Sequence, residues 1–207
     1  SRMKTVLVLC EFSGAVSSAF RKKGFASISN DLLPSNLDEQ HHIQGDCFAA
    51  IDAFKSKVGH IDLIVMFPPC TAIAVSGNRF YGRGMPKHEQ RIESIEWTLR
   101  LWEYAKANAD HVAMENPVNV LPVKASQFIH PYEFGHPEQK KTGLWLHNLP
   151  ELTETCNVYA AMMELPKKDR ERIHYMSPSK DRWKLRSTTF PGIAQAMALQ
   201  WGEYLNG

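Results

Sequence analysis

The sequence contains few of the features that mark several large protein classes. It has only four cysteines, and no two of them form a C-x-x-C pair, which excludes a zinc knuckle or a disulfide framework as the basis of the fold. No apolar run reaches the length of about 18 residues that a membrane-spanning helix needs. No charged and then apolar leader precedes the first apolar run, so we expect a reduced, cytoplasmic protein.

An excess of one charge is also lacking. The 24 lysines and arginines nearly balance the 22 aspartates and glutamates, and this balance does not by itself indicate a nucleic-acid partner. The nine histidines are scattered, and even the pair His41 and His42 predicts no metal site. There is no internal repeat, and 207 residues favour one domain with a small insertion or extension.

The main pattern in the chain is an alternation of apolar runs and amphipathic stretches. The runs at Thr5–Leu9 and Ile61–Phe67 are typical of strands that are buried on both faces. Further strands are expected at 26–29, 42–46 and 111–114. Helices are expected from about 13 to 23 and over 48–58, 87–109 and 192–204. This order predicts an α/β protein with a doubly wound, mostly parallel sheet and helices on both faces.

Two segments do not follow this alternation. Thr71–Pro86 is rich in glycine and predicts a loop of about 16 residues, longer than ordinary connections. Residues 126–186 carry scattered prolines and short apolar stretches such as Gly143–Leu146, which suggest antiparallel strands and loops.

Cys70 occupies the most informative position in the sequence. It follows Pro68 and Pro69 directly after the buried strand 61–67, and the two prolines stiffen the approach to the thiol. Ligands of open α/β sheets bind outside the carboxyl ends of the strands. A cysteine here is therefore either a small packed side chain or a reactive group.

The ends of the other predicted strands carry residues suited to a nucleoside-containing cofactor. The turn of small residues at 12–14 lets the backbone approach a ligand. Asp31 could accept hydrogen bonds from ribose hydroxyls, and Asp46 could accept one from an adenine amino group. Each aspartate also fits an ordinary turn or a helix N-cap, and it is their joint position that favours the cofactor.

In this order the motifs resemble those of the cytosine-5 DNA methyltransferases, and specifically a compact, bacteriophage-like member. Residues 12–14 are similar to the family's F-x-G cofactor turn, Pro69-Cys70 to its nucleophile motif, and 115–117 to its glutamate-asparagine-valine motif. The resemblance implies a Rossmann-like methyltransferase fold, S-adenosylmethionine as cofactor, and the cytoplasm of the host cell for a phage protein. The implied catalytic residues are Cys70 and Glu115. The implied cofactor contacts are Phe12, Ser13, Gly14, Asp31, Asp46 and Pro68. The implied substrate contacts are Ser76, Arg79, Asn116, Pro117, Lys140 and Lys141.

The chemistry of cytosine explains why these residue types would be needed. Adding a Cys70 thiolate to C6 makes C5 reactive toward a methyl group, and an acid such as Glu115 would supply a proton at N3. The base must leave its stack to be attacked, so the expected partner is DNA, as a duplex with a flipped cytosine, and the segment with Arg79 and Arg83 would cover the base.

The sequence departs from the family in three ways. Val16 stands where a second glycine is usual, Thr71 replaces a glutamine, and only about forty residues are available for target recognition, less than an independent domain. We therefore divide the chain into a catalytic core at 3–146, a reduced recognition segment at 147–186 and a closing helix at 187–207. Eight lysines and arginines between 167 and 186 are either phosphate contacts or a solvated surface.

Other functions remain open at this stage. Amino-group methyltransferases carry a Pro-Pro-aromatic motif after Asp or Asn at the same strand end, but Phe67 and Cys70 occupy those two places. The short recognition segment is also compatible with a free pyrimidine nucleotide as substrate, or with a modified form of S-adenosylmethionine as donor. A non-catalytic cofactor- or DNA-binding protein is a further alternative, which the presence of both Cys70 and Glu115 disfavours.

Overall fold

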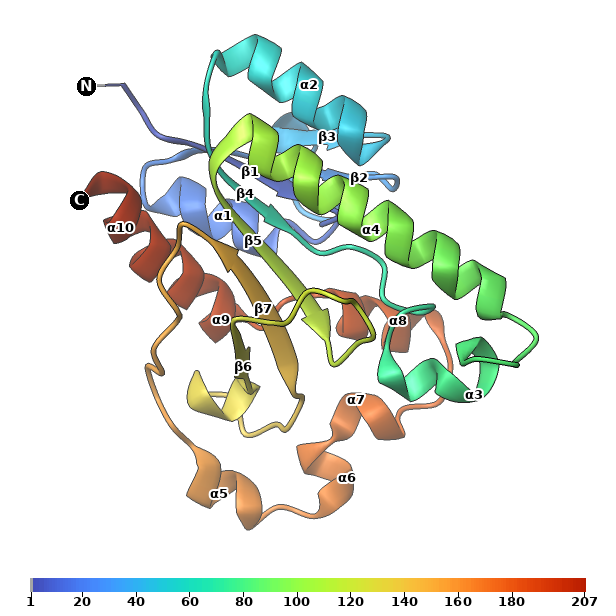
Figure 1. Ribbon diagram of the computed structural model, residues 1–207. Coiled ribbons are helices and arrows are strands. Elements are labelled where there is room, and N and C mark those ends of the chain that lie inside the picture. Colours follow the sequence, from blue (N-terminus) through green and yellow to red (C-terminus); the bar gives the residue numbers. More distant parts are fainter. Residues whose placement is uncertain (1) are drawn as a thin grey trace.

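A seven-stranded sheet forms the centre of the protein in the computed structural model, which describes residues 2–207 (Figure 1). The strand order is β3-β2-β1-β4-β5-β7-β6. The strands are β1 (Thr5–Leu9), β2 (Ala26–Asp31), β3 (His42–Gln44), β4 (Ile61–Met66), β5 (Ala109–Pro117), β6 (Gln127–Ile129) and β7 (Thr142–His147). The first five pair in parallel, and β7 runs antiparallel to both of its neighbours, β5 and β6. The predicted doubly wound, mostly parallel sheet is confirmed.

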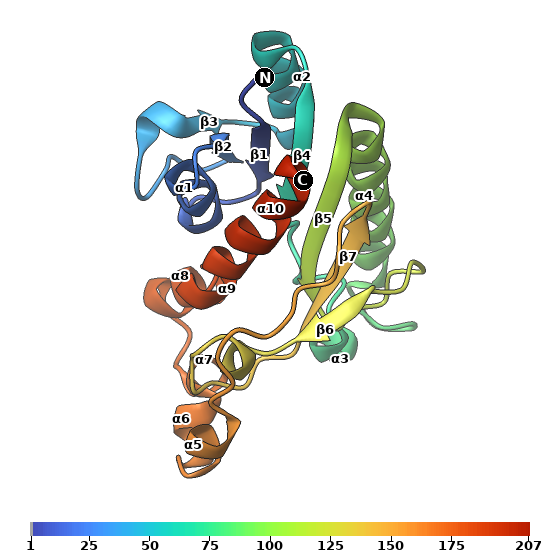
Figure 2. The same ribbon diagram turned by 90° about the vertical axis from the view of Figure 1, so that its left-hand side faces the viewer.

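Helices cover both faces of the sheet, because successive side chains of a strand point to opposite sides. In β1, Val6 and Val8 belong to one core, and Leu7 and Leu9 belong to the other. Figure 2 shows α1 and α10 on one side of the sheet and α4 on the other. The covering helices are α1 (Ala15–Lys22), α2 (Cys47–Val58), α4 (His88–Asn108), α9 (Pro191–Ala196), the π-helical turn η4 (Met197–Trp201) and α10 (Gly202–Asn206).

The predicted helices and strands are present, with shifted ends. The largest change is in β5, which extends on both sides of the predicted 111–114. Its pairing with β7 continues from Val112 opposite His147 to Pro117 opposite Thr142, and this ladder carries the strand past its apolar centre. Short 3-10 turns also form at η1 (Glu39–His41) and η3 (Pro131–Glu133).

The segment 71–86 is more ordered than the predicted loop. It contains the short helices η2 (Val75–Gly77) and α3 (Asn78–Tyr81). The buried Arg91 of α4 donates hydrogen bonds to the carbonyl oxygens of Ala72 (2.8 Å) and Ala74 (3.0 Å) and to Oδ1 of Asn78 (2.9 Å). One guanidinium group thus fastens the chain after Cys70 to α4.

The region between β7 and α9 differs from the sequence-based expectation. Strands β6 and β7 are the antiparallel strands expected within 126–186, and the described residues between His147 and α9 include no strand. Four short helices follow instead: α5 (Tyr159–Met163), α6 (Lys167–Arg170), α7 (Arg172–Tyr175) and α8 (Lys180–Ser187). Helices α5 to α7 lie beyond the carboxyl ends of the parallel strands (Figures 1 and 2). Among residues 2–207, no helix combines the length and apolar character that a membrane crossing requires.

Candidate active site

A cleft opens at the carboxyl ends of β1, β2, β4 and β5, and it gathers most of the predicted site residues. Its volume is about 360 Å³, within the range of small-molecule pockets. Nine of the fourteen predicted site residues line it: Phe12, Asp31, Pro68, Cys70, Ser76, Glu115, Asn116, Pro117 and Lys140. Residues from positions 10 to 187 thus contribute to one cleft.

Cys70 and Glu115 line this cleft from the ends of adjacent strands. Strands β4 and β5 pair as far as Met66 and Met114, so Glu115 directly follows the last pair and Cys70 lies four residues beyond Met66. Burial raises the pKa of Glu115, and Lys140 partly opposes this. Burial also raises the pKa of the Cys70 thiol, Arg186 opposes it, and the nearby Glu115 adds to the rise.

The raised pKa of Glu115 favours its protonated form. The raised pKa of Cys70 disfavours the thiolate, which therefore needs nearby cations to stabilise it. A carboxyl group with a raised pKa keeps its proton at a higher pH and can donate it. A thiol with a raised pKa gives less thiolate, and Arg186 and Lys140 are the cations that favour the thiolate form. The two cations are themselves connected, since Nζ of Lys140 donates to the carbonyl oxygen of Arg186 at 3.2 Å.

The side chain of Asn116 forms hydrogen bonds to residues on two sides of the cleft. It is buried, and its amide nitrogen donates to the carbonyl oxygen of Pro68 at 3.1 Å. Its amide oxygen accepts from Nδ2 of Asn119 at 3.0 Å. Asn116 therefore links the end of β5 to the start of the segment that carries Cys70.

The turn after β1 is shaped by a buried carboxylate that sequence reasoning did not single out. Glu11 is 3% exposed and accepts hydrogen bonds from the backbone nitrogens of Val16 (2.8 Å) and Ser17 (3.1 Å). Burial raises the pKa of Glu11 to about 7. Gly14 has a φ of 73°, which favours glycine, and Oγ of Ser13 accepts from the backbone of the helix that follows. Ser13 and Gly14 thus form the turn without lining the cleft.

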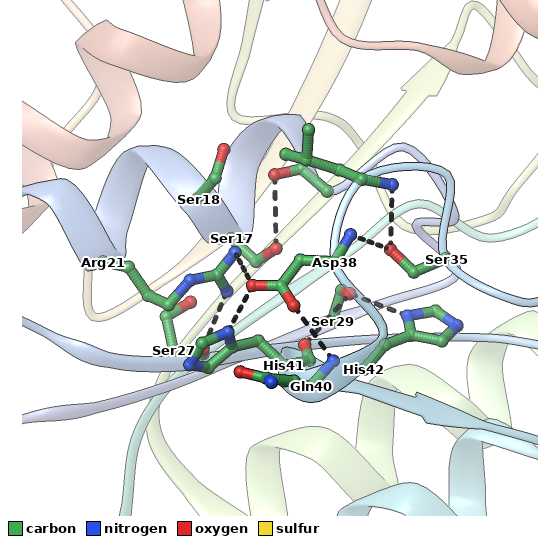
Figure 3. Close-up of polar contacts among 12 residues, drawn as sticks. Ser17, Ser18, Arg21, Ser27, Ser29, Ser35, Asp38, Gln40, His41 and His42 are labelled. Atoms are coloured by element: carbon green, nitrogen blue, oxygen red, sulfur yellow. Dashed lines mark hydrogen bonds and ion pairs between the residues drawn. The ribbon is translucent and has the colours of Figure 1, made fainter.

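The chain between β2 and β3 packs along this turn and is held by polar contacts (Figure 3). The backbone nitrogen of Asn36 donates to the carbonyl oxygen of Phe12 at 2.8 Å. Asp38 contacts the ring of His41 and lies 4.0 Å from Arg21 of α1. The hydrogen bond from His41 is the main reason that the pKa of Asp38 is lowered. These contacts fix the segment that begins at Asp31.

Besides Ser13 and Gly14, three predicted site residues do not line the cleft. Asp46 is exposed and caps α2, accepting from the backbone nitrogen of Ala49 at 2.9 Å. Nζ of Lys141 lies 4.6 Å from the centre of the Phe128 ring. Arg79 lines a neighbouring cavity instead of the cleft. For Asp46, the helix-cap interpretation agrees with the geometry.

Comparison with solved structures shows the fold that builds this cleft. The chain is similar to the structure of the Entamoeba histolytica methyltransferase EhMeth, with a TM-score of 0.50 and 13% sequence identity. The two proteins share an α/β fold. The match covers 76% of this chain and 58% of EhMeth, so the chain spans less than two thirds of that protein's length. Neither a protein-family model nor a curated protein sequence matches the chain.

Two residues that border the cleft come from the short helices near the C-terminus. The ring of Trp183 on α8 stacks on Phe12, with ring centres 5.1 Å apart and an angle of 16° between the planes. Arg186, one turn later, lines the same cleft. The sequence offered only their place in a basic segment, which does not reveal a contact with the first strand end.

His60, Asp62 and Asp110 gather at the other end of the sheet, at the starts of β4 and β5. Their side chains are engaged with protein partners. Asp62 accepts two hydrogen bonds of 2.7 Å from the guanidinium group of Arg2 and one of 2.8 Å from the backbone nitrogen of Thr5. Nε2 of His60 lies 2.7 Å from Oδ2 of Asp110. This cluster ties the strand starts together and does not border the cleft.

Proposed function

We propose that this protein transfers a methyl group from S-adenosylmethionine to C5 of cytosine in DNA, through an adduct between Cys70 and C6 of the base. One observation carries the proposal: Cys70 and Glu115 line the same cleft at adjacent strand ends of an α/β fold that is similar to the structure of a methyltransferase. A thiol beside a carboxyl group of raised pKa is the pair that attack on a pyrimidine ring requires.

The residues would act in sequence on the base. The Cys70 thiolate, favoured by Arg186 and Lys140, forms a bond to C6 while Glu115 gives its proton to N3. The electron pair displaced from the C5–C6 double bond becomes available at C5, which would take the methyl group as the methyl–sulfur bond of S-adenosylmethionine breaks and S-adenosylhomocysteine leaves. Loss of the C5 proton to a solvent base would then restore the double bond and release the thiolate, while N3 returns its proton to Glu115.

The cleft also has residues suited to the cofactor. Phe12, Asp31 and Pro68 line the same cleft as Cys70, at the ends of β1, β2 and β4. Oδ1 of Asp31 accepts from the backbone nitrogen of Leu33, which orients the carboxylate at the strand end. S-adenosylmethionine, when bound, supplies an electrophilic methyl group. Oδ2 of Asp46 caps α2, and the adenine contact of this carboxylate stays a prediction.

A free pyrimidine nucleotide is the alternative substrate. The helical segment after β7 favours it, because α6 and α7 are only four residues long and bury none of their side chains. So small a segment leaves little surface for reading a DNA sequence.

A labelling experiment tests the proposal and this alternative together. Incubation with tritiated S-adenosylmethionine should label duplex DNA, whereas label on mononucleotides alone would contradict the choice of DNA. DNA that contains 5-fluorocytosine should form a covalent adduct with the parent protein and with the control Cys156→Ser, whose cysteine is exposed. The adduct should be absent from Cys70→Ser. Parental activity in Cys70→Ala would show that the thiolate mechanism is wrong.

A further inference from the structure

A second cavity adjoins the Cys70 cleft and is rich in guanidinium groups. It has a volume of about 400 Å³ and lies between α3 on one side and α6, α7 and α8 on the other (Figure 1). We call it the arginine cavity. Its cationic lining residues are Arg79, Lys140, Arg170, Arg172, Arg182 and Arg186. Ser76, Lys140 and Arg186 belong to both cavities, so the two share a wall.

The carboxylates in the arginine cavity do not neutralise this charge. Six cations face two carboxylates, Glu138 and Glu171. Glu138 forms an ion pair with Arg172, whose guanidinium group donates to both carboxylate oxygens at 3.1 Å. A carboxylate oxygen of Glu171 lies 3.9 Å from Nζ of Lys167. Among the side chains that the structure describes, no carboxylate lies within ion-pair distance of Arg79, Arg182 or Arg186.

Some of the donors are buried and lack a hydrogen-bond partner in the described part of the chain. Nε of Arg182 and Nε of Arg170 are both in this state. The other contact of the Arg182 guanidinium, to the carbonyl oxygen of His174, is long at 3.5 Å. Buried donors without partners are costly, and an anion in the cavity would satisfy them.

We propose that the arginine cavity binds the phosphate group of the nucleotide whose base enters the Cys70 cleft, with Arg79, Arg182 and Arg186 as the donors. This proposal rests on the proposed function, because it takes a pyrimidine nucleotide as the substrate. Guanidinium groups present paired donors that match phosphate oxygens. The shared wall of Lys140 and Arg186 would lie between the two ends of one nucleotide, base on one side and phosphate on the other.

Two sources can supply this phosphate, a phosphodiester of DNA or a free nucleotide monophosphate. The experiment therefore uses a fluorescein-labelled duplex, followed by anisotropy, and unlabelled dCMP or deoxycytidine as competitors. The test variant is Arg79→Met with Arg182→Met, since these residues line the arginine cavity from α3 and α8 and neither lines the Cys70 cleft. The control is Lys22→Met with Lys23→Met, which removes the same charge from an exposed part of the α1 region.

The test variant should bind the duplex at least about tenfold more weakly, and its slope of log affinity against log salt should fall by roughly one to two. The control should stay within about twofold of the parent. The parent should prefer dCMP to deoxycytidine, and the test variant should lose this preference. Competition by dCMP at micromolar concentration would assign the phosphate to a free nucleotide, and competition by DNA alone would assign it to a phosphodiester.

Thermal melting and binding of tritiated S-adenosylmethionine report whether the variants fold. If the double variant does not fold, Arg79→Met alone tests the same phosphate site. Parental affinity and slope in the folded variant would overturn the arginine-cavity proposal even if the parent methylates DNA. Loss of phosphate binding in the variant, with no methylation by the parent, would support the cavity and reject the proposed function.

Discussion

The Cys70 cleft and the arginine cavity share a wall but are built in opposite ways. The cleft lies at the ends of paired strands, and its two reactive groups, Cys70 and Glu115, have pKa values shifted by burial. The arginine cavity is closed by helices of four to eight residues that carry most of its cations. The sheet therefore fixes the positions of the reacting groups, while the short helices supply positive charge.

The stability of the two walls differs for a physical reason. Helices as short as α6 and α7 do not persist alone in water, and these two bury no side chain. They depend on a few contacts with the core, including the Arg172–Glu138 pair and a hydrogen bond of 2.7 Å from the nitrogen of Gln139 to the carbonyl oxygen of Arg170. The strand ends are held by continuous ladders over two buried cores.

The largest expected effect comes from the cleft. Glu115→Gln removes the proton donor without changing the size of the side chain, and kcat should fall by about 10² to 10⁴. DNA affinity should stay near that of the parent, because Glu115 contributes no positive charge. Single-turnover kinetics and anisotropy measure the two quantities, with Glu39→Gln as a surface control. Equal losses of kcat and DNA affinity in Glu115→Gln would contradict the assignment of the reaction to the cleft and of phosphate binding to the arginine cavity.

A smaller effect is expected in stability on the cleft side. The folded pKa of Glu11, about 7, lies above its ordinary value of 4.5, so the folded state binds the proton more tightly than the unfolded state. The free energy of unfolding should therefore fall as pH rises from about 4.5 to 7, by roughly 3 kcal/mol from this group.

Urea unfolding across this pH range tests the Glu11 prediction. Glu11→Gln should lack the fall, so the difference between parent and variant should change by that amount. Glu203→Gln, on the exposed side of α10, should follow the parent. Parallel curves for the parent and Glu11→Gln would show that the burial of this carboxyl group does not control its protonation.

The smallest expected effect lies on the shared wall. Arg186 opposes the rise in the pKa of Cys70, so Arg186→Gln should raise that pKa further. The midpoint of the pH profile for alkylation of Cys70 by iodoacetamide, followed by peptide mass spectrometry, should move to higher pH. Lys184→Gln on the same helix is the matched control. An unchanged midpoint would mean that the charge of Arg186 does not affect the pKa of the Cys70 thiol.

The sequence predicted the sheet and the meeting of Cys70 with Glu115, because parallel strands bring their carboxyl ends to one edge. It was less decisive where one residue type has two uses. Asp46 fits both a helix cap and a ligand contact, and it caps α2. Lys140 and Lys141 are neighbours just before β7, and only Lys140 lines the cleft.

Contacts between distant segments were not predictable from local patterns. Trp183 and Phe12 stack although they lie near opposite ends of the chain. Arg91 looks like one charge on an amphipathic helix, yet it is buried and holds the segment after Cys70. Such contacts depend on how helices close over the sheet, which the periodicity of a single segment does not encode.

Helix α8 contributes residues to both the Cys70 cleft and the arginine cavity. Trp183 on this helix contacts the turn at Phe12, while Arg182 and Arg186 face the arginine cavity. A ligand that shifted helix α8 as it entered beside Phe12 would also shift Arg182 and Arg186, the proposed phosphate donors. If one ligand changes the affinity for the second by some factor, the second ligand changes the affinity for the first by the same factor. Helix α8 (Lys180–Ser187) would therefore couple ligand binding in the Cys70 cleft to ligand binding in the arginine cavity.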